Sequence, residues 1–148
     1  MSAQHDPGLH VVARVRGVRE RDSRLGLAAA LAEEEAASSR VAELEERLTS
    51  LDAPATGTLA AFTARQRMIT ALSEALAAAR DAWQSAHVVA VAARDRWHAD
   101  HTRLAAVESL IERRAGVRAL ATRRREGREL DAIAEELWRR GNRQEAIS

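Results

Sequence analysis

Cysteine, lysine and tyrosine are absent from this 148-residue sequence, and proline occurs only twice. Without cysteine the chain can form no disulfide, no thiolate metal site and no cysteine nucleophile. Aromatic residues make up only 3% of the sequence, as one Phe and three Trp. Because large side chains are so scarce, the sequence favours a narrow seam between helices over a compact globular core.

Alanine is what the sequence has in abundance, at 33 positions. Alanine is the strongest helix former but buries little apolar area. The β-branched residues show no alternation typical of strands. We therefore expect an all-α protein of one domain, residues 1–148.

The charges and apolar runs argue against a membrane span and against a protein dominated by phosphate binding. The formal net charge is only +1. Met1–Gly8 is polar and does not resemble a signal peptide. The longest uncharged apolar patch, Val88–Ala93, is far shorter than the ~20 residues that cross a bilayer. We expect a cytoplasmic protein.

Turn and capping residues predict two helices of unequal length. Asp6-Pro7 is typical of an N-cap followed by the first helical residue. Asp52–Gly57 is the one interior cluster of turn residues, and Thr56 or Thr58 can cap the second helix. Gly141-Asn142 is a plausible helix end. We expect helix one over about 7–51, a turn over 52–57 and helix two over about 58–140.

A heptad repeat in the second helix predicts a coiled coil. Starting from Phe62, its a and d positions run without a slip to Ile111, and only Arg65 and Asp100 are charged. The first helix matches this repeat near the turn, and its earlier apolar residues drift around the helix. The fold class expected is therefore an antiparallel two-helix coiled-coil hairpin with a longer second helix. The matching positions in the first helix are Val41, Leu44, Leu48 and Leu51.

Folding the two helices antiparallel about residue 55 predicts which residues face each other, because their residue numbers should add to about 110. Leu48 should then meet Phe62, Val41 should meet Ile69, and the ring of Trp83 should pack over Gly26. The first helix ends opposite about residue 103, which leaves residues 104–140 without a partner. Their apolar side chains indicate a binding surface. A homodimer, or a fold-back at Gly116 or Gly127, would also cover them.

No pattern of catalytic or metal-binding residues stands out. His98 and His101 have metal-ligand spacing but no evident third ligand. No HExxH, glycine-rich phosphate loop or GxSxG occurs, so we expect no enzyme, no cofactor and no metal. Residues 113–128 hold seven arginines and one acid. Because these arginines surround the helix and no aromatic platform accompanies them, we expect no specific nucleic-acid binding. A basic sleeve inside an acidic protein cavity, or a solvated face, fits better.

The two ends of the chain resemble the FliJ proteins. The resemblance lies in the run Leu9–Ala29, in Glu108-x-Leu110-Ile111-Glu112-Arg113-Arg114 and in Arg125-Glu126-x-Arg128-Glu129-Leu130-Asp131-x-Ile133-Ala134. It implies a cytoplasmic, non-enzymatic subunit of the flagellar type III protein export apparatus, with a part in flagellum biogenesis and chemotaxis. Such a subunit acts as the central stalk of the export ATPase ring and contacts the export gate protein and export chaperones. It is peripheral to the inner face of the cell membrane through its partners only.

The resemblance also implies which residues bind partners, since segments 9–24 and 108–138 would lie in the ATPase ring. These residues are Arg16, Arg19, Glu20, Leu110, Arg113, Arg114, Arg123, Arg124, Arg125, Glu126, Leu130, Asp131 and Trp138. The alternative is a generic coiled-coil scaffold or a homodimerising protein without an export role, and a nonspecific binder of nucleic acid or anionic surfaces is a third possibility.

Overall fold

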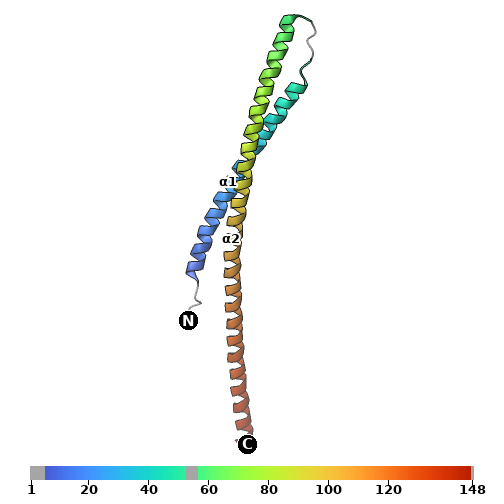
Figure 1. Ribbon diagram of the computed structural model, residues 1–148. Helices are drawn as coiled ribbons and strands as arrows, with labels where there is room; N and C mark the ends of the chain where they lie inside the picture. The colour runs from blue at the N-terminus through green and yellow to red at the C-terminus, as the bar shows by residue number, and fades with distance from the viewer. Residues whose placement is uncertain (1–5, 53–56, 148) are drawn as a thin grey trace. The chain divides into compact units, whose positions relative to one another are not determined.

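The computed structural model describes residues 6–52 and 57–147, and nearly all of these are helical. Helix α1 spans Pro7–Thr49 and helix α2 spans Leu59–Ile147. The two helices contain 43 and 89 residues, so the all-α fold with a longer second helix is confirmed. None of the described helices is long and apolar enough to cross a membrane. Figure 1 shows the course of the chain.

Local chemistry explains where both helices begin. Pro7 is the first residue of α1, where its missing N–H has no partner to lose. The hydroxyl of Thr58 accepts a hydrogen bond from the amide of Ala61 at 3.2 Å, as an N-cap does. The predicted cap at Thr58 is thus confirmed. Residues 53–56, which include Thr56 and most of the predicted turn, lie outside the described residues.

The expected end of the second helix is wrong, because α2 continues through Gly141 to Ile147. The fold-back at Gly116 or Gly127 is also wrong, since α2 passes through both glycines without a break. None of the described glycines has a positive φ. A glycine inside a helix costs only ~1 kcal/mol relative to alanine, so strong helix formers on both sides carry the helix through.

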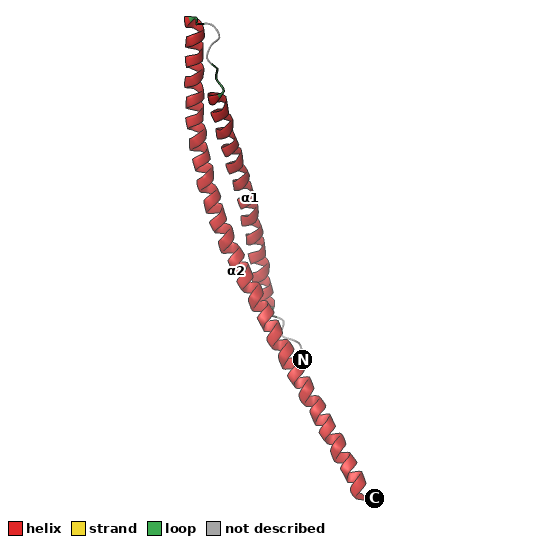
Figure 2. Cartoon of the chain, turned by 90° about the vertical axis from the view of Figure 1, so that its right-hand side faces the viewer, coloured by secondary structure: helices red, strands yellow, loops and turns green. Residues whose placement is uncertain are grey.

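The chain divides into two compact units: Arg16–Arg103, and Met1–Val15 together with Leu104–Ser148. We call the first the hairpin unit and the second the terminal unit. Within the hairpin unit, α1 and α2 run antiparallel and side by side (Figures 1 and 2).

The seam of the hairpin unit follows the predicted heptad repeat. From Arg65 to Asp100, every a and d position of α2 is buried or half-buried, and so are Val41, Leu44, Leu48 and Leu51 of α1. The two charged positions that interrupt the repeat lie in the seam as well. Asp100 is only 8% exposed, and Nε of Arg65 donates to the carbonyl of Asp52 at 3.2 Å. The coiled-coil repeat is therefore confirmed.

The predicted register between the helices is wrong by about ten residues. Leu48 and Leu72 pack against one core that contains the buried Leu44 and Leu76, and Phe62 is not part of it. Three other contacts between the helices show the same register, because the residue numbers of the two partners add to about 120 in each contact. These contacts are Arg80 to Glu45 at 2.9 Å, His87 to Glu34 at 2.6 Å and Trp97 to Glu20 at 3.1 Å.

The turn accounts for this difference. α1 ends at Thr49, and Arg65 of α2 is bonded to Asp52, which lies beyond the end of α1. Leu59 and Phe62 are consequently 81% and 54% exposed. The predicted register, centred on about residue 55, would instead have placed Phe62 against Leu48.

The predicted packing of Trp83 over Gly26 is wrong for the same reason. No side chain lies within 4 Å of the position that a Cβ of Gly26 would occupy. Gly26 borders an open groove of about 510 Å³ together with Val89 and Ala93. Trp83 instead stacks on His87, with ring centroids 5.4 Å apart.

Candidate partner-binding site

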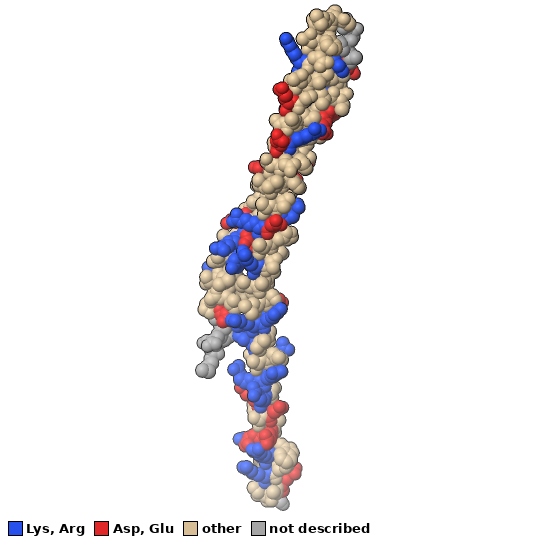
Figure 3. Space-filling view, viewed as in Figure 1, with Lys and Arg blue, Asp and Glu red and all other residues tan. Residues whose placement is uncertain are grey.

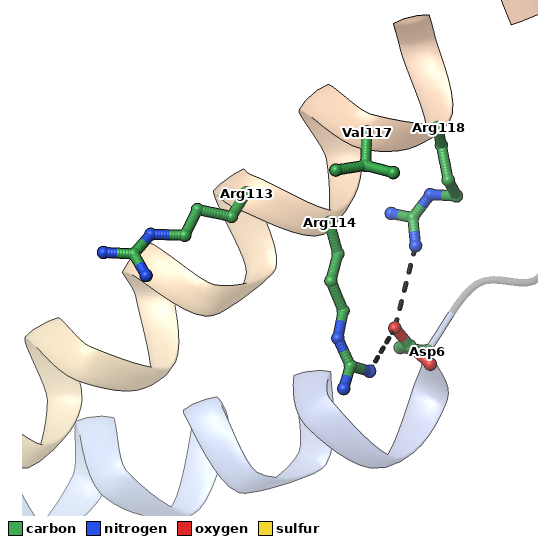
Figure 4. Close-up of a pocket in the computed structure, with 5 residues that line it drawn as sticks. All are labelled: Asp6, Arg113, Arg114, Val117 and Arg118. Atoms are coloured by element: carbon green, nitrogen blue, oxygen red, sulfur yellow. Dashed lines mark hydrogen bonds and ion pairs between the residues drawn. The ribbon is translucent and has the colours of Figure 1, made fainter. Parts of the chain in front are cut away.

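In the terminal unit, an ion pair joins the beginning of α1 to α2. Nη1 of Arg114 donates to Oδ2 of Asp6 at 2.7 Å, and Nη1 of Arg118 lies 3.7 Å from the same oxygen. Figure 4 shows both guanidinium groups pointing toward Asp6, while Arg113 points away from it. These residues and Val117 line a shallow hollow of about 330 Å³.

The ion pair shifts the titration of Asp6. The hydrogen bond from Arg114 lowers the pKa of the Asp6 carboxyl below its ordinary value of 3.8, and the charges of Arg114, Arg118 and His10 act in the same direction. Desolvation opposes them. The carboxylate is therefore ionised at neutral pH and holds two arginines of α2.

The ion pair also changes where the unpartnered part of α2 begins. The sequence predicted that residues 104–140 lack a partner, but Leu104, Val107 and Ile111 are half-buried in the terminal unit. The contact with Asp6 reaches as far as Arg118. The expected start at residue 104 is thus wrong, because the register is shifted. From Ala119 to Ile147, every residue except Gly127 is exposed, and we call this segment the tail.

The tail carries large apolar side chains in contact with water. Leu130 is 66% exposed, Leu137 is 62% exposed and Trp138 is 67% exposed, and Ile133 is exposed as well. Successive residues of a helix differ by ~100° in direction, so Leu130, Ile133 and Leu137 share one face. Exposed apolar residues that cluster on one face indicate a surface for a partner.

Arginines surround α2 at the beginning of the tail and just before it. The block Arg113–Arg128 holds seven arginines and Glu126 as its one acid. Figure 3 shows basic side chains along both edges of this part of α2. Further along, Arg139 pairs with Glu135 and Arg140 pairs with Glu136 on the surface of the helix. The tail is thus basic at its start and carries balanced pairs near its end.

The structure brings most of the predicted partner-binding residues together on one helix. In the terminal unit they all lie on α2 and are exposed, Leu110 at 39%. They are Leu110, Arg113, Arg114, Arg123, Arg124, Arg125, Glu126, Leu130, Asp131 and Trp138. The other three, Arg16, Arg19 and Glu20, belong to the hairpin unit. Their role in binding partners stays a prediction.

Glu20 has an evident role inside the hairpin unit. It is 8% exposed, and Oε1 accepts a hydrogen bond from the indole Nε1 of Trp97. Arg24 and His101 each lie 3.9 Å from the same oxygen. Sequence reasoning missed this contact because it followed apolar residues along α1, whereas the seam there also contains Glu20 and Ser23.

Asp6 was predicted only as a helix cap, and its contact with α2 was missed. Its backbone carbonyl does accept hydrogen bonds from the amides of Leu9 and His10. Its side chain reaches Arg114, which is 108 residues away along the chain. Only a correct register could have revealed the pair. Over the described residues, no group of three His, Asp or Glu side chains has a geometry that could hold a metal ion.

A comparison with protein families gives a match over most of the chain. The family model described as "Flagellar FliJ protein" matches residues 5–143. No curated protein and no solved structure matches the chain. The matched range includes nearly all of both helices, the arginine block and the tail as far as Arg143.

Proposed function

This chain belongs to the FliJ family of flagellar proteins, and from that premise we propose that it is the central stalk of the flagellar export ATPase. Membership makes it a component of the flagellar protein export apparatus, in a family without enzymatic activity. The generic scaffold without an export role is therefore the weaker alternative.

The exposed tail is the observation that carries the proposal. A helix that enters a ring of subunits needs contacts in several directions, because subunits surround it. The arginines of block 113–128 provide positive charge on several sides of α2, while Leu130, Leu137 and Trp138 provide apolar anchors. Acidic and apolar surfaces inside the ring would complement both features.

A substitution pair tests the stalk role directly. We expect Leu130→Glu/Leu137→Glu to reduce binding to the export ATPase, and the stimulation of ATP hydrolysis, by at least about tenfold. The matched control is Met68→Glu/Val88→Glu, which changes two apolar residues of the hairpin unit that are 52% and 59% exposed. The control should bind and stimulate like the unchanged chain. Equal loss in both variants, or loss in neither, would contradict the stalk role.

The arginine block makes a separate contribution under this proposal. Because charged contacts act over longer distances than apolar ones, Arg123→Glu/Arg124→Glu/Arg125→Glu should slow association with the ATPase, and most strongly at low salt. Stopped-flow association rates at several salt concentrations measure this. A rate that stays unchanged in low salt would assign the block to another partner.

We also propose contacts with the export gate protein and with export chaperones, and location at the inner face of the membrane through these partners. The hairpin unit offers exposed apolar residues for such contacts, among them Val88, Val89 and Leu25. Pull-down of the gate protein by a chain truncated after Arg118, which keeps the hairpin unit and lacks the tail, tests this. Retained capture supports a gate contact outside the tail, and lost capture opposes it.

A further inference from the structure

Two clusters of the same composition join α1 to α2 in the hairpin unit. In the first, Nδ1 of His87 lies 2.6 Å from Oε1 of Glu34, and the ring of Trp83 stacks on His87. In the second, Trp97 stacks on His101, with ring centroids 5.0 Å apart. Nε1 of Trp97 donates to Oε1 of Glu20 at 3.1 Å, and Nδ1 of His101 lies 3.9 Å from the same oxygen. Each cluster thus contains a glutamate of α1 and a Trp and a His of α2.

The spacing of the clusters is the same on both helices. Trp83 and Trp97 are 14 residues apart, as are His87 and His101, and so are Glu20 and Glu34. Fourteen residues are two heptads, so both clusters present the same face of each helix to the seam. Since the helices are antiparallel, both clusters form together in one alignment of the helices.

Small residues of the seam between the clusters do not define that alignment. Ala30 and Ala90 are buried there, and Ala86 and Ala93 are half-buried. Sliding α1 by one heptad, ~10 Å along the axis, would place Ala37 or Ser23 where Ala30 now lies, so a small residue would still fill that position. The leucines near the turn have the same period. The heptad pattern alone is therefore compatible with more than one register.

The clusters distinguish these registers. Sliding α1 by one heptad would place Leu27 or Val41 where Glu34 now lies, opposite His87. The place of Glu20 would be taken by Ala13 or Leu27, neither of which has a side-chain acceptor for the indole N–H of Trp97. A slide of two heptads would restore the glutamate of one cluster and place Asp6 or Leu48 at the glutamate position of the other. Polar groups in a coiled-coil seam are known to specify register in this way, at some cost in stability.

We propose that the clusters Glu34–His87–Trp83 and Glu20–His101–Trp97 are a register lock, which selects one alignment of the two helices from the several that the heptad repeat permits. The lock acts through direct contacts within the hairpin unit and requires no partner.

Spin labels can measure the register, because the chain contains no cysteine. Labels on Ser39→Cys and Ala92→Cys, both at exposed positions, report the offset of α1 against α2 in electron–electron double resonance. The unchanged seam should give one distance. Glu20→Leu/Glu34→Leu replaces the two lock carboxylates by apolar side chains that suit a seam, so the chain should remain helical by circular dichroism. It should then show a second distance, displaced by up to ~10 Å, in more than about a tenth of molecules.

Two further variants make the test decisive. The control Glu33→Leu/Glu46→Leu makes the same chemical change at exposed positions and should keep one distance. His87→Leu/His101→Leu changes only exposed rings and should also produce the second distance, in a smaller fraction because Trp97 still reaches Glu20. If both lock variants keep the single distance of the unchanged seam, or the control gains a second one, the register lock is overturned. If Glu20→Leu/Glu34→Leu fails to fold, the histidine variant decides alone by the same criterion.

Discussion

The hairpin unit and the tail are both helical, but different residues are buried in them. Between Arg16 and Arg103, the two helices cover one face of each other, and even the polar Glu20, Ser23 and Asp100 are at most 8% exposed. Between Ala119 and Ile147, apolar residues as large as Trp138 are exposed. Burial in this protein therefore does not follow the hydrophobicity of each residue.

This difference separates two reasons for keeping a large apolar side chain. In the hairpin unit, Leu44 and Leu76 are buried and hold the helices together. In the tail, Leu137 and Trp138 make no comparable contribution to the fold, because most of their surface stays in water. The cost of exposing them is offset if they bind another protein, which is why the tail is the better place to look for function.

Truncating one leucine in each region should give the largest contrast. Leu44 is only 2% exposed, so Leu44→Ala should lower the free energy of unfolding by about 2–5 kcal/mol through lost burial and a residual cavity. Leu137→Ala should change it by less than about 0.5 kcal/mol. Urea denaturation followed by circular dichroism measures both. Similar losses would mean that the tail packs as the hairpin unit does.

The sequence was sufficient to predict the fold class, the start of α1 and the heptad seam. Helix propensity and a period of 3.5 are local properties, which can be read without knowing the partner of each residue. The register could not be read in the same way. It depends on how much chain the turn uses, and residues with equal spacing on both helices satisfy several alignments.

The candidate site was predictable only where it depends on local properties of the sequence and not on the register. The exposed leucines and arginines of the tail stand out in the sequence because α2 is much longer than α1. Part of α2 must therefore lack a partner helix within the chain. The contact between Asp6 and Arg114, and the burial of Glu20 against Trp97, both depended on the register. The helix end at Gly141 was mispredicted because glycine weakens a helix without terminating it when strong helix formers follow.

Removing one hydrogen bond in the seam should have the next largest effect. Trp97→Phe keeps a ring but loses the donor to Glu20, whose carboxylate stays buried with fewer partners. We expect a loss of about 1–3 kcal/mol in the free energy of unfolding. Trp138→Phe, the matched change in the tail, should be close to neutral. A neutral Trp97→Phe would show that Arg24 and His101 suffice to satisfy Glu20.

The ion pair at Asp6 should make stability depend on pH in the terminal unit. Because Arg114 lowers the pKa of Asp6 in the folded state, the pair stabilises the fold above the carboxyl's unfolded value and this contribution is lost as the pH falls. Asp6→Asn should therefore lower the melting temperature at neutral pH, and this effect should shrink progressively as the pH falls below the ordinary value of 3.8.

A double-mutant cycle distinguishes this ion pair from a general effect of charge. In an Arg114→Gln background, the pH-dependent part of the Asp6→Asn effect should largely disappear, because the main donor to the carboxylate is gone. An unchanged effect would mean that Arg118, 3.7 Å from the carboxylate, is the more important partner.

The smallest expected effect concerns ion pairs along one helix, and it tests whether the tail depends on local interactions alone. Glu135→Gln and Glu136→Gln remove the pairs with Arg139 and Arg140, each worth about 0.3 kcal/mol. The tail has no packing that opposes fraying of the helix. Loss of these pairs should therefore accelerate amide hydrogen exchange around them about twofold. Glu43→Gln removes a similar i,i+4 pair with Arg47 and an i,i+3 pair with Arg40 in α1. Packing holds the helix there, so exchange should hardly change. In about 1 M salt the tail effect should vanish, because exposed pairs are screened. Equal acceleration in both regions would mean that α1 is no better supported than the tail.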